Sequence, residues 1–169
     1  MISRTDIEKY FVAEKQESLL FIGIGVAAII IALLGLFLWR TQFWKGAAIV
    51  LIVIALIQIV AGYTVYKRCD ADRTRVVYAL DMNPDQLKAK ELPRIETVNK
   101  NFVIYRYVEI ALIIAGAVLI VLYRNNNDKQ FWYGLGVALT LQAILTLSGD
   151  IVAAKRALTY TEQLKTLLK

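Results

Sequence analysis

The chain has 169 residues, of which 58% are hydrophobic and 20% are charged, and its formal net charge is +6. A mean hydropathy of +0.53, with the apolar residues gathered in long runs, excludes an ordinary soluble domain and predicts an integral membrane protein. The chain has no histidine and one cysteine, which excludes histidine-based catalysis and an intramolecular disulfide, so we expect a protein without catalytic residues, cofactor or metal site.

Residues 1–17 are polar and helix-prone. Thr5 and Glu8 have the spacing of a capping box, and Ile7, Tyr10 and Phe11 form a narrow apolar stripe. This pattern predicts an amphipathic cytoplasmic helix that lies on the membrane surface or packs against the bundle. The segment is rich in charge and has no apolar signal-peptide core, so we expect no cleaved signal.

Two apolar segments follow in close succession, at 18–39 and 45–66. A helix of about 20 residues, rising ~1.5 Å per residue, matches the ~30 Å hydrocarbon layer of a bilayer, so each segment predicts one membrane span. The polar connection around Arg40 is very short. It therefore favours an antiparallel hairpin, which we assign to residues 18–66.

The second apolar segment recurs near the C-terminus as a near copy without a gap. The shared residues are Gln42, Phe43, Trp44, Gly46, Lys67 and Arg68, which recur as Gln130, Phe131, Trp132, Gly134, Lys155 and Arg156. Aromatic residues at one end of a span predict an interfacial belt, and basic residues at the other predict lipid-facing anchors. The predicted belt consists of Trp39, Phe43, Trp44, Tyr123, Phe131 and Trp132, and the predicted cytoplasmic anchors are Lys67, Arg68, Lys155 and Arg156.

Residues 67–101 are predicted to form a cytoplasmic helical connector. The helix of the second span is expected to continue in polar form to about Met82, and Asn83 and Pro84 have the chemistry that starts a short new helix. Pro93 is predicted to end that short helix. From Pro93 an apolar stripe predicts one rod of about 32 residues that ends near Arg124.

Residues 102–154 are predicted to form a second hairpin, and residues 155–169 a cytoplasmic C-terminal helix. The predicted fold class is an all-α integral membrane protein. Its four transmembrane helices form two tandem antiparallel hairpins, a parallel internal repeat, with helices extended into the cytoplasm.

Fifteen of the 20 basic residues lie in the segments 1–17, 67–101 and 155–169. Because Lys and Arg stay on the cytoplasmic side, both termini are predicted to be cytoplasmic, in a chain that crosses the bacterial cytoplasmic (inner) membrane. Attraction to anionic lipid head groups accounts for the basic excess. No aromatic or glycine-rich motif favours nucleic-acid binding, so the lipid bilayer is the predicted partner of these charges.

A few polar side chains fall inside the predicted spans, where such groups face the bundle or a watery cavity. This intramembrane polar cluster consists of Arg106, Glu109, Asp150, Gln142, Thr146 and Ser148. Arg106 and Asp150 lie at the same depth, so we predict a salt bridge between them, with Glu109 as a competing or bridging acid. A proton or ion relay is the alternative for the charged members. Hydrogen bonds between helices, or a transport pathway, are the alternatives for the uncharged ones.

Two further features allow alternatives. Cys69 follows an anchor pair, so it is either an inert thiol at a helix end or a lipidated cysteine. Small residues spaced by four predict packing seams, internal or between copies of the chain; these are Gly23 and Ala27, Ala28 and Ala32, and Ala111 and Ala115.

The sequence favours a non-enzymatic binding or assembly module, of accessory or immunity type, that acts through its cytoplasmic helices. A protein partner or a homo-oligomer is expected. The alternative is an oligomeric ion channel or small transporter, with the polar residues of the third and fourth spans lining the pathway.

Overall fold

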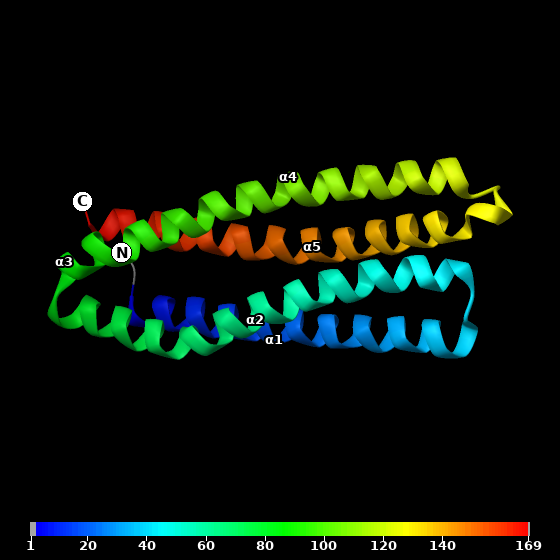
Figure 1. Cartoon of the computed structure of the whole chain (residues 1–169). Coiled ribbons are helices and arrows are strands. Elements are labelled where there is room, and N and C mark those ends of the chain that lie inside the picture. The colour runs from blue at the N-terminus through cyan, green and yellow to red at the C-terminus, as the bar shows by residue number, and fades with distance from the viewer. Residues whose placement is uncertain (1–2, 169) are drawn as a thin grey trace.

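Four long helices pack as two antiparallel hairpins in the computed structural model, which describes residues 3–168 (Figure 1). The first hairpin consists of α1 (Arg4–Leu34), continued by a π-helical turn (Gly35–Trp39), and α2 (Gln42–Met82). The second consists of α4 (Leu92–Tyr123) and α5 (Gln130–Leu167). All four helices are long and apolar enough to cross a membrane, as predicted for a multi-pass membrane protein.

The two ends of the helix bundle differ in what they contain. The loop end holds the two hairpin connections, and the polar end holds the start of α1, the end of α5 and the short helix α3 (Pro84–Gln86) (Figure 1). At the loop end Arg40 has φ 50°, a left-handed conformation that reverses the chain, and the Thr41 side chain accepts a hydrogen bond from the backbone N–H of Trp44. The second connection contains a 3-10 turn, Asn127–Lys129, capped by the side chain of Asn126.

The capping box of α1 lies two residues earlier than predicted. The Ser3 side chain accepts a hydrogen bond from the backbone N–H of Asp6 (3.2 Å), and the Asp6 carboxylate accepts one from the backbone N–H of Ser3 (2.9 Å). The predicted box at Thr5 and Glu8 is wrong because both residues are already inside the helix. Glu8 instead forms an i, i+4 ion pair with Arg4.

Pro93 does not end a helix. Helical structure runs from Pro84 to Tyr123, and α4 itself has 32 residues, as its apolar stripe predicts. A π-helical turn, Leu87–Glu91, precedes Pro93, and the N–H of Leu92 donates to the carbonyl of Leu87. The hydrogen-bond pattern of the helix therefore changes just before Pro93, the residue that has no backbone N–H. Because of this change, the energetic cost of a proline within the helix is small at this position.

The two hairpins meet mainly where α2 and α5 cross near the loop end. A Cβ at Gly46 would lie 1.9 Å from the carbonyl oxygen of Phe131, and a Cβ at Gly134 would lie 2.1 Å from that of Phe43. The contact is reciprocal, since the near-copy residues of the two hairpins take equivalent roles. Only glycine permits backbones to approach this closely, so these two positions set the crossing of the hairpins.

Small residues also form the seams inside each hairpin. Ala28 and Ala32 are buried between α1 and α2, which confirms one predicted seam as internal. The other two predicted seams do not pack inside the chain. Gly23 and Ala27, and likewise Ala111 and Ala115, are exposed on the outer faces of α1 and α4.

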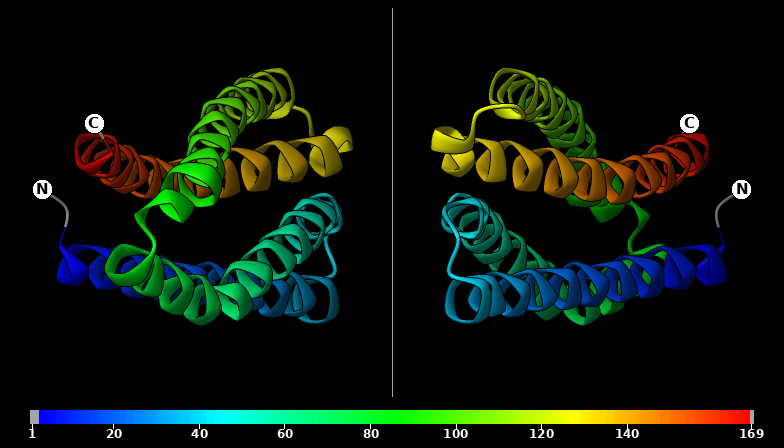
Figure 2. Two further views of the ribbon diagram at one scale, coloured as in Figure 1. Left: turned by 90° about the vertical axis from the view of Figure 1, so that its left-hand side faces the viewer. Right: turned by 90° about the vertical axis from the view of Figure 1, so that its right-hand side faces the viewer.

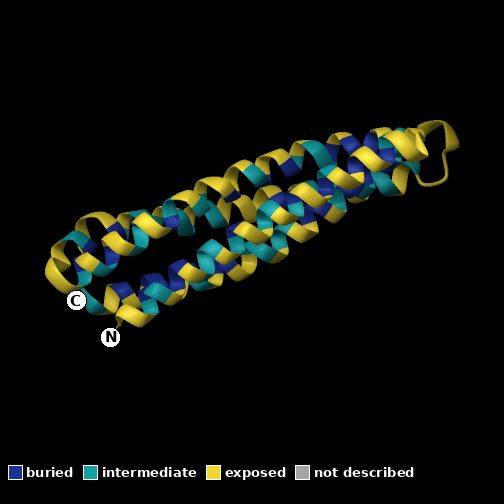
Figure 3. Ribbon diagram, turned by 90° about the horizontal axis from the view of Figure 1, so that it is seen from below, coloured by how far each residue is buried: buried dark blue, intermediate teal, exposed yellow. Residues whose placement is uncertain are grey.

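Buried residues are spread along α1, α2 and α5, whereas α4 buries only Ile95, Glu109 and Gly116 (Figure 3). Seen from either end, the hairpins form two layers, with α4 at the edge above α5 (Figure 2). At the polar end all four helices contribute to one core, whose largest fully buried apolar side chains are Phe11, Ile7, Leu87, Ile95 and Leu164. The amphipathic N-terminal helix thus packs against the bundle as an extension of α1.

Candidate functional site

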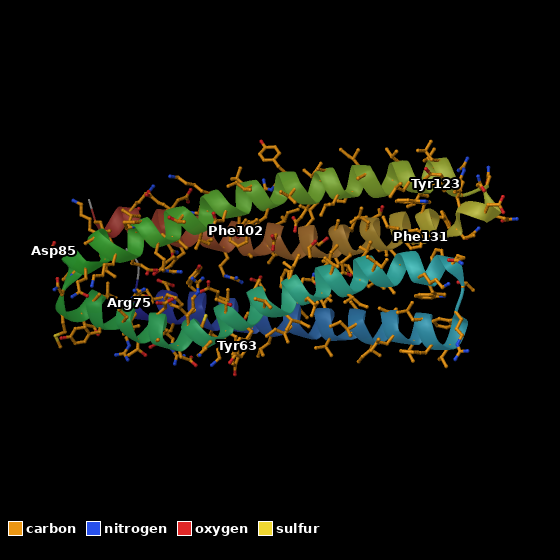
Figure 4. The ribbon with its side chains drawn as sticks, in the orientation of Figure 1. Tyr63, Arg75, Asp85, Phe102, Tyr123 and Phe131 are labelled. Atoms are coloured by element: carbon orange, nitrogen blue, oxygen red, sulfur yellow. The ribbon has the colours of Figure 1, made fainter. Side chains whose placement is uncertain are left out.

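The predicted aromatic belt lies at the loop end. Trp39 stacks on Trp44 with ring centroids 4.7 Å apart, and Tyr123 lies 6.4 Å from Trp132. Phe43 contacts Tyr133 across the two hairpins at 5.7 Å. Phe131 packs edge-on against Trp132. Figure 4 labels Tyr123 and Phe131 at this end of the molecule.

The four predicted anchors divide into two kinds. Lys67 and Lys155 are exposed, as expected of side chains that reach lipid head groups. Arg68 and Arg156 instead turn inward to carboxylates of α1: Arg68 lies 3.5 Å from Glu14, and Arg156 is hydrogen-bonded to Glu17. The two arginines therefore join α1 to α2 and α5, a role that the anchor prediction did not include.

The predicted salt bridge between Arg106 and Asp150 is absent from the described part of the chain, residues 3–168. Arg106 is exposed on α4, while Glu109 is buried with only 8% of its surface exposed. Within the spans α4 packs chiefly on α5, so only a narrow face of α4 is covered. Arg106 falls outside that face although it is three residues from Glu109.

The acid that Asp150 faces is therefore Glu109. The two carboxyl groups, one on α4 and one on α5, lie close enough to interact, and Thr146 lies beside Glu109 one turn before Asp150. The Oε2 atom of Glu109 is buried and has no hydrogen-bond partner among the described residues. Asp150 also faces Glu17 of α1.

The uncharged polar residues of α5 act in different ways. The Gln142 side chain donates a hydrogen bond of 2.8 Å to the Gln58 side chain, and this contact joins α5 to α2 inside the apolar region. Thr146 and Ser148 donate to backbone carbonyls of their own helix. Gln142 thus links helices as the hydrogen-bond interpretation expects, whereas Ser148 is exposed.

Sequence reasoning missed a buried ion network at the polar end. Glu91 is 2% exposed and lies 2.6 Å from Arg94 and 3.4 Å from Arg75 of α2, which Figure 4 labels. The Tyr160 hydroxyl donates a hydrogen bond of 3.2 Å to Glu91. The i, i+3 spacing of Glu91 and Arg94 was visible in the sequence, but their burial depends on α2 and α5, which are distant in the chain.

Aromatic side chains close this network on the side of α1. Tyr10 stacks on Tyr160 with ring centroids 4.2 Å apart, and the Arg94 guanidinium lies 5.5 Å from the centre of the Phe11 ring. Burial and then the negative charge of Glu91 raise the pKa of Tyr160 above its ordinary value. Its hydroxyl therefore stays neutral and remains a hydrogen-bond donor to Glu91.

Cys69 belongs to the polar-end core, with 1% of its surface exposed. Its thiol lies 3.5 Å from the carbonyl oxygen of Phe11 and 3.6 Å from the Glu14 carboxylate. Burial and the neighbouring negative charge of Glu14 raise the pKa of Cys69 to about 12. A buried thiol that stays protonated is a poor nucleophile, which favours the inert thiol over the lipidated one.

A surface hollow of about 230 Å³ lies between α1 and α2 at the polar end. Its lining combines the apolar side chains of Phe11, Val12 and Leu19 with Lys15, Gln16, Asp70 and Arg73. Lys15 and Arg73 both pair with Asp70, so the charges of the hollow largely satisfy each other. Within residues 3–168 there is no group of three or more Cys, Asp or Glu side chains arranged to hold a metal ion.

Comparison of the chain with protein-family models, with curated proteins and with solved structures finds no match.

Proposed function

We propose that the protein is a non-enzymatic assembly module of the bacterial cytoplasmic membrane that binds a protein partner through its polar end. The excess of Lys and Arg at that end supports a cytoplasmic location for both termini and for the connector between the hairpins. In this orientation the extensions of all four helices stand in the cytoplasm as a small bundle.

The observation that supports this proposal most strongly is that ion pairs connect the helices to one another at the polar end. Glu14, Lys15 and Glu17 of α1 pair with Arg68, Asp70 and Arg156 of α2 and α5. Lys165 of α5 pairs with Glu96 of α4 at 2.6 Å. A bundle fixed in this way has little freedom to lose on binding, which favours recognition of a partner.

The tip of α2 offers the contact surface. Tyr78 and Met82, one helical turn apart, have exposed fractions of 62% and 72% although they lie in the polar extension of the helix. Tyrosine and methionine are enriched at protein interfaces. We assign these two side chains as the apolar anchor of the interface.

A photo-crosslinking amino acid at position 78 tests the assignment in native membranes. We expect it to give a discrete protein adduct, and we expect the substitutions Tyr78→Ala and Met82→Ala to remove the same protein from the purified complex. The matched control is position 107, where Tyr107, also exposed (71%, against 62% for Tyr78), lies on the apolar part of α4 and should react with lipid. An adduct at position 107 but none at position 78 would contradict the proposal.

The second candidate function is an oligomeric ion channel or small transporter. The specific observation that favours it is the buried carboxyl pair between α4 and α5, because ionisable groups inside a membrane mark ion and proton pathways. Ion flux through vesicles that contain only the purified protein would establish this function in place of assembly.

A further inference from the structure

Glu109 and Asp150 place two acids against each other within the apolar part of the bundle. Glu109 is more than nine-tenths buried, and its Oε2 atom points into the contact between α4 and α5 without a hydrogen-bond partner among the described residues. Asp150 is partly buried on the facing helix. Neither carboxyl group forms an ion pair with a basic side chain in residues 3–168.

Two adjacent carboxylates cannot both keep their charge in such a place at low cost. The Coulomb repulsion between them is weakly screened away from water, and each charge also loses its hydration. A positive partner must therefore bind at the pair. The set of ligand atoms favours a proton, because two carboxyl groups and one threonine hydroxyl offer at most five oxygen atoms, fewer than the six or more that hard metal ions usually take.

We propose that Glu109 and Asp150 form a proton-binding site that holds one proton between the two carboxyl groups and thereby ties α4 to α5. The proton comes from water and is bound to an oxygen of one carboxyl group. The resulting O–H group donates a hydrogen bond to the other carboxylate, so the unpartnered Oε2 of Glu109 gains a partner. The pair then carries one negative charge instead of two.

Charged and polar side chains of the neighbouring helices surround the carboxyl pair. On α1, Glu17 faces Asp150 and is itself paired with Arg156 of α5, one to two turns closer to the polar end. On α4, Arg106 lies on the exposed flank. On α2, Gln58 pairs with Gln142 and so lies about two turns nearer the loop end than Asp150. The polar side chains of α2 closer to the level of Asp150 are Tyr63 and Thr64, and both are exposed. Glu17 is thus the acid of α1 that faces the pair, and it lies on the polar-end side of the site.

The site also gives α4 a proton-dependent attachment. Near the loop end α4 is held against α5 by the close contact between Gly116 and Gly136, where an added Cβ would lie 2.9 Å from a backbone oxygen. Between that contact and the polar-end core, the carboxyl pair is the polar link between the two helices. Loss of the shared proton leaves two like charges, which push α4 away from α5.

Infrared difference spectroscopy of the protein in lipid nanodiscs tests the proposal. At neutral pH the wild type should show the carbonyl band of one protonated carboxyl group, which disappears as the pH is raised. The double substitution Glu109→Gln with Asp150→Asn should remove the band. Glu162→Gln, which neutralises an exposed acid on α5, and Arg106→Gln should both leave it in place.

Two results would overturn the site. A wild type without a pH-dependent band shows that the pair binds no proton. A band that weakens when sodium replaces potassium at constant pH assigns the site to a metal cation instead. If the double variant fails to fold, modification of wild-type Glu109 by a hydrophobic carbodiimide decides the question: modification at neutral pH that is lost at alkaline pH supports the proposal, and no modification contradicts it.

Discussion

The substitution Gly134→Ala is expected to lower the free energy of unfolding by about 2–3 kcal/mol, the range of severe overpacking. The new Cβ would lie 2.1 Å from the carbonyl oxygen of Phe43, and that atom belongs to the backbone of a helix, so no side chain can move aside to make room. The crossing of α2 and α5 must open instead. Unfolding in a denaturing detergent, followed by circular dichroism, measures the loss.

Gly46→Ala should cost about as much, because it is the reciprocal contact of the same crossing. The double variant should cost less than the sum of the two single variants, since one opening relieves both clashes. The matched control is Gly23→Ala, where an added Cβ has no neighbour within 4 Å. Equal stability of the Gly23 and Gly134 variants would show that the hairpins do not cross at these glycines.

Removal of the Glu91 carboxylate is expected to destabilise the polar end by about 3 kcal/mol, the lower bound for breaking a buried ion pair. In Glu91→Leu the Arg94 guanidinium, with 16% of its side chain exposed, stays in the core without its carboxylate at 2.6 Å. Tyr160 loses its hydrogen-bond acceptor at the same time. Thermal unfolding in nanodiscs gives the difference in stability.

A double-mutant cycle separates the pair from its surroundings. In Arg94→Leu, Arg75 is the basic residue that remains paired with Glu91. The double variant Glu91→Leu with Arg94→Leu should be more stable than Glu91→Leu, because the double variant leaves no unpaired Arg94 charge in the core. Lys165→Ala serves as control, since it breaks an exposed ion pair with Glu96 and should change little. Strictly additive losses in the cycle would contradict the network.

The sequence predicts those features that depend on local pattern. The apolar runs and the repeated Phe-Trp and Lys-Arg pairs predict four helices in two hairpins, and the stripe after Pro93 predicts a single long helix. The prediction that Pro93 ends a helix was wrong, because a π-helical turn at Leu87–Glu91 precedes the proline and the helix continues through it. That adjustment depends on backbone geometry that residue type alone does not specify.

The sequence predicted which residues form the intramembrane polar cluster, but it did not predict which of them contact each other. Depth in the membrane follows from counting residues along a helix, and it brings Arg106, Glu109 and Asp150 to similar levels. Which of them face each other depends on how α4 is rotated about its own axis against α5, and in that rotation Gly116 lies against Gly136. The rotation buries Glu109 and leaves Arg106 outside, so two acids meet where a salt bridge was expected.

The two ends of the molecule are stabilised by different means. At the loop end, close backbone contact at Gly46 and Gly134 holds the hairpins together. At the polar end, a packed core with ion pairs between the helices does so. The proposed assembly role needs the second of these ends to face the cytoplasm.

Cysteine labelling of intact cells tests that orientation most directly. We predict that a membrane-impermeant maleimide labels Asn126→Cys, at the loop end, in intact cells, and labels Asp85→Cys, at the polar end, only after the cells are permeabilised. Native Cys69 should stay unlabelled in both because it is buried, and it should react once the protein is denatured. Labelling of Asp85→Cys in intact cells, with Asn126→Cys reached only after permeabilisation, would place the polar end outside and contradict the account.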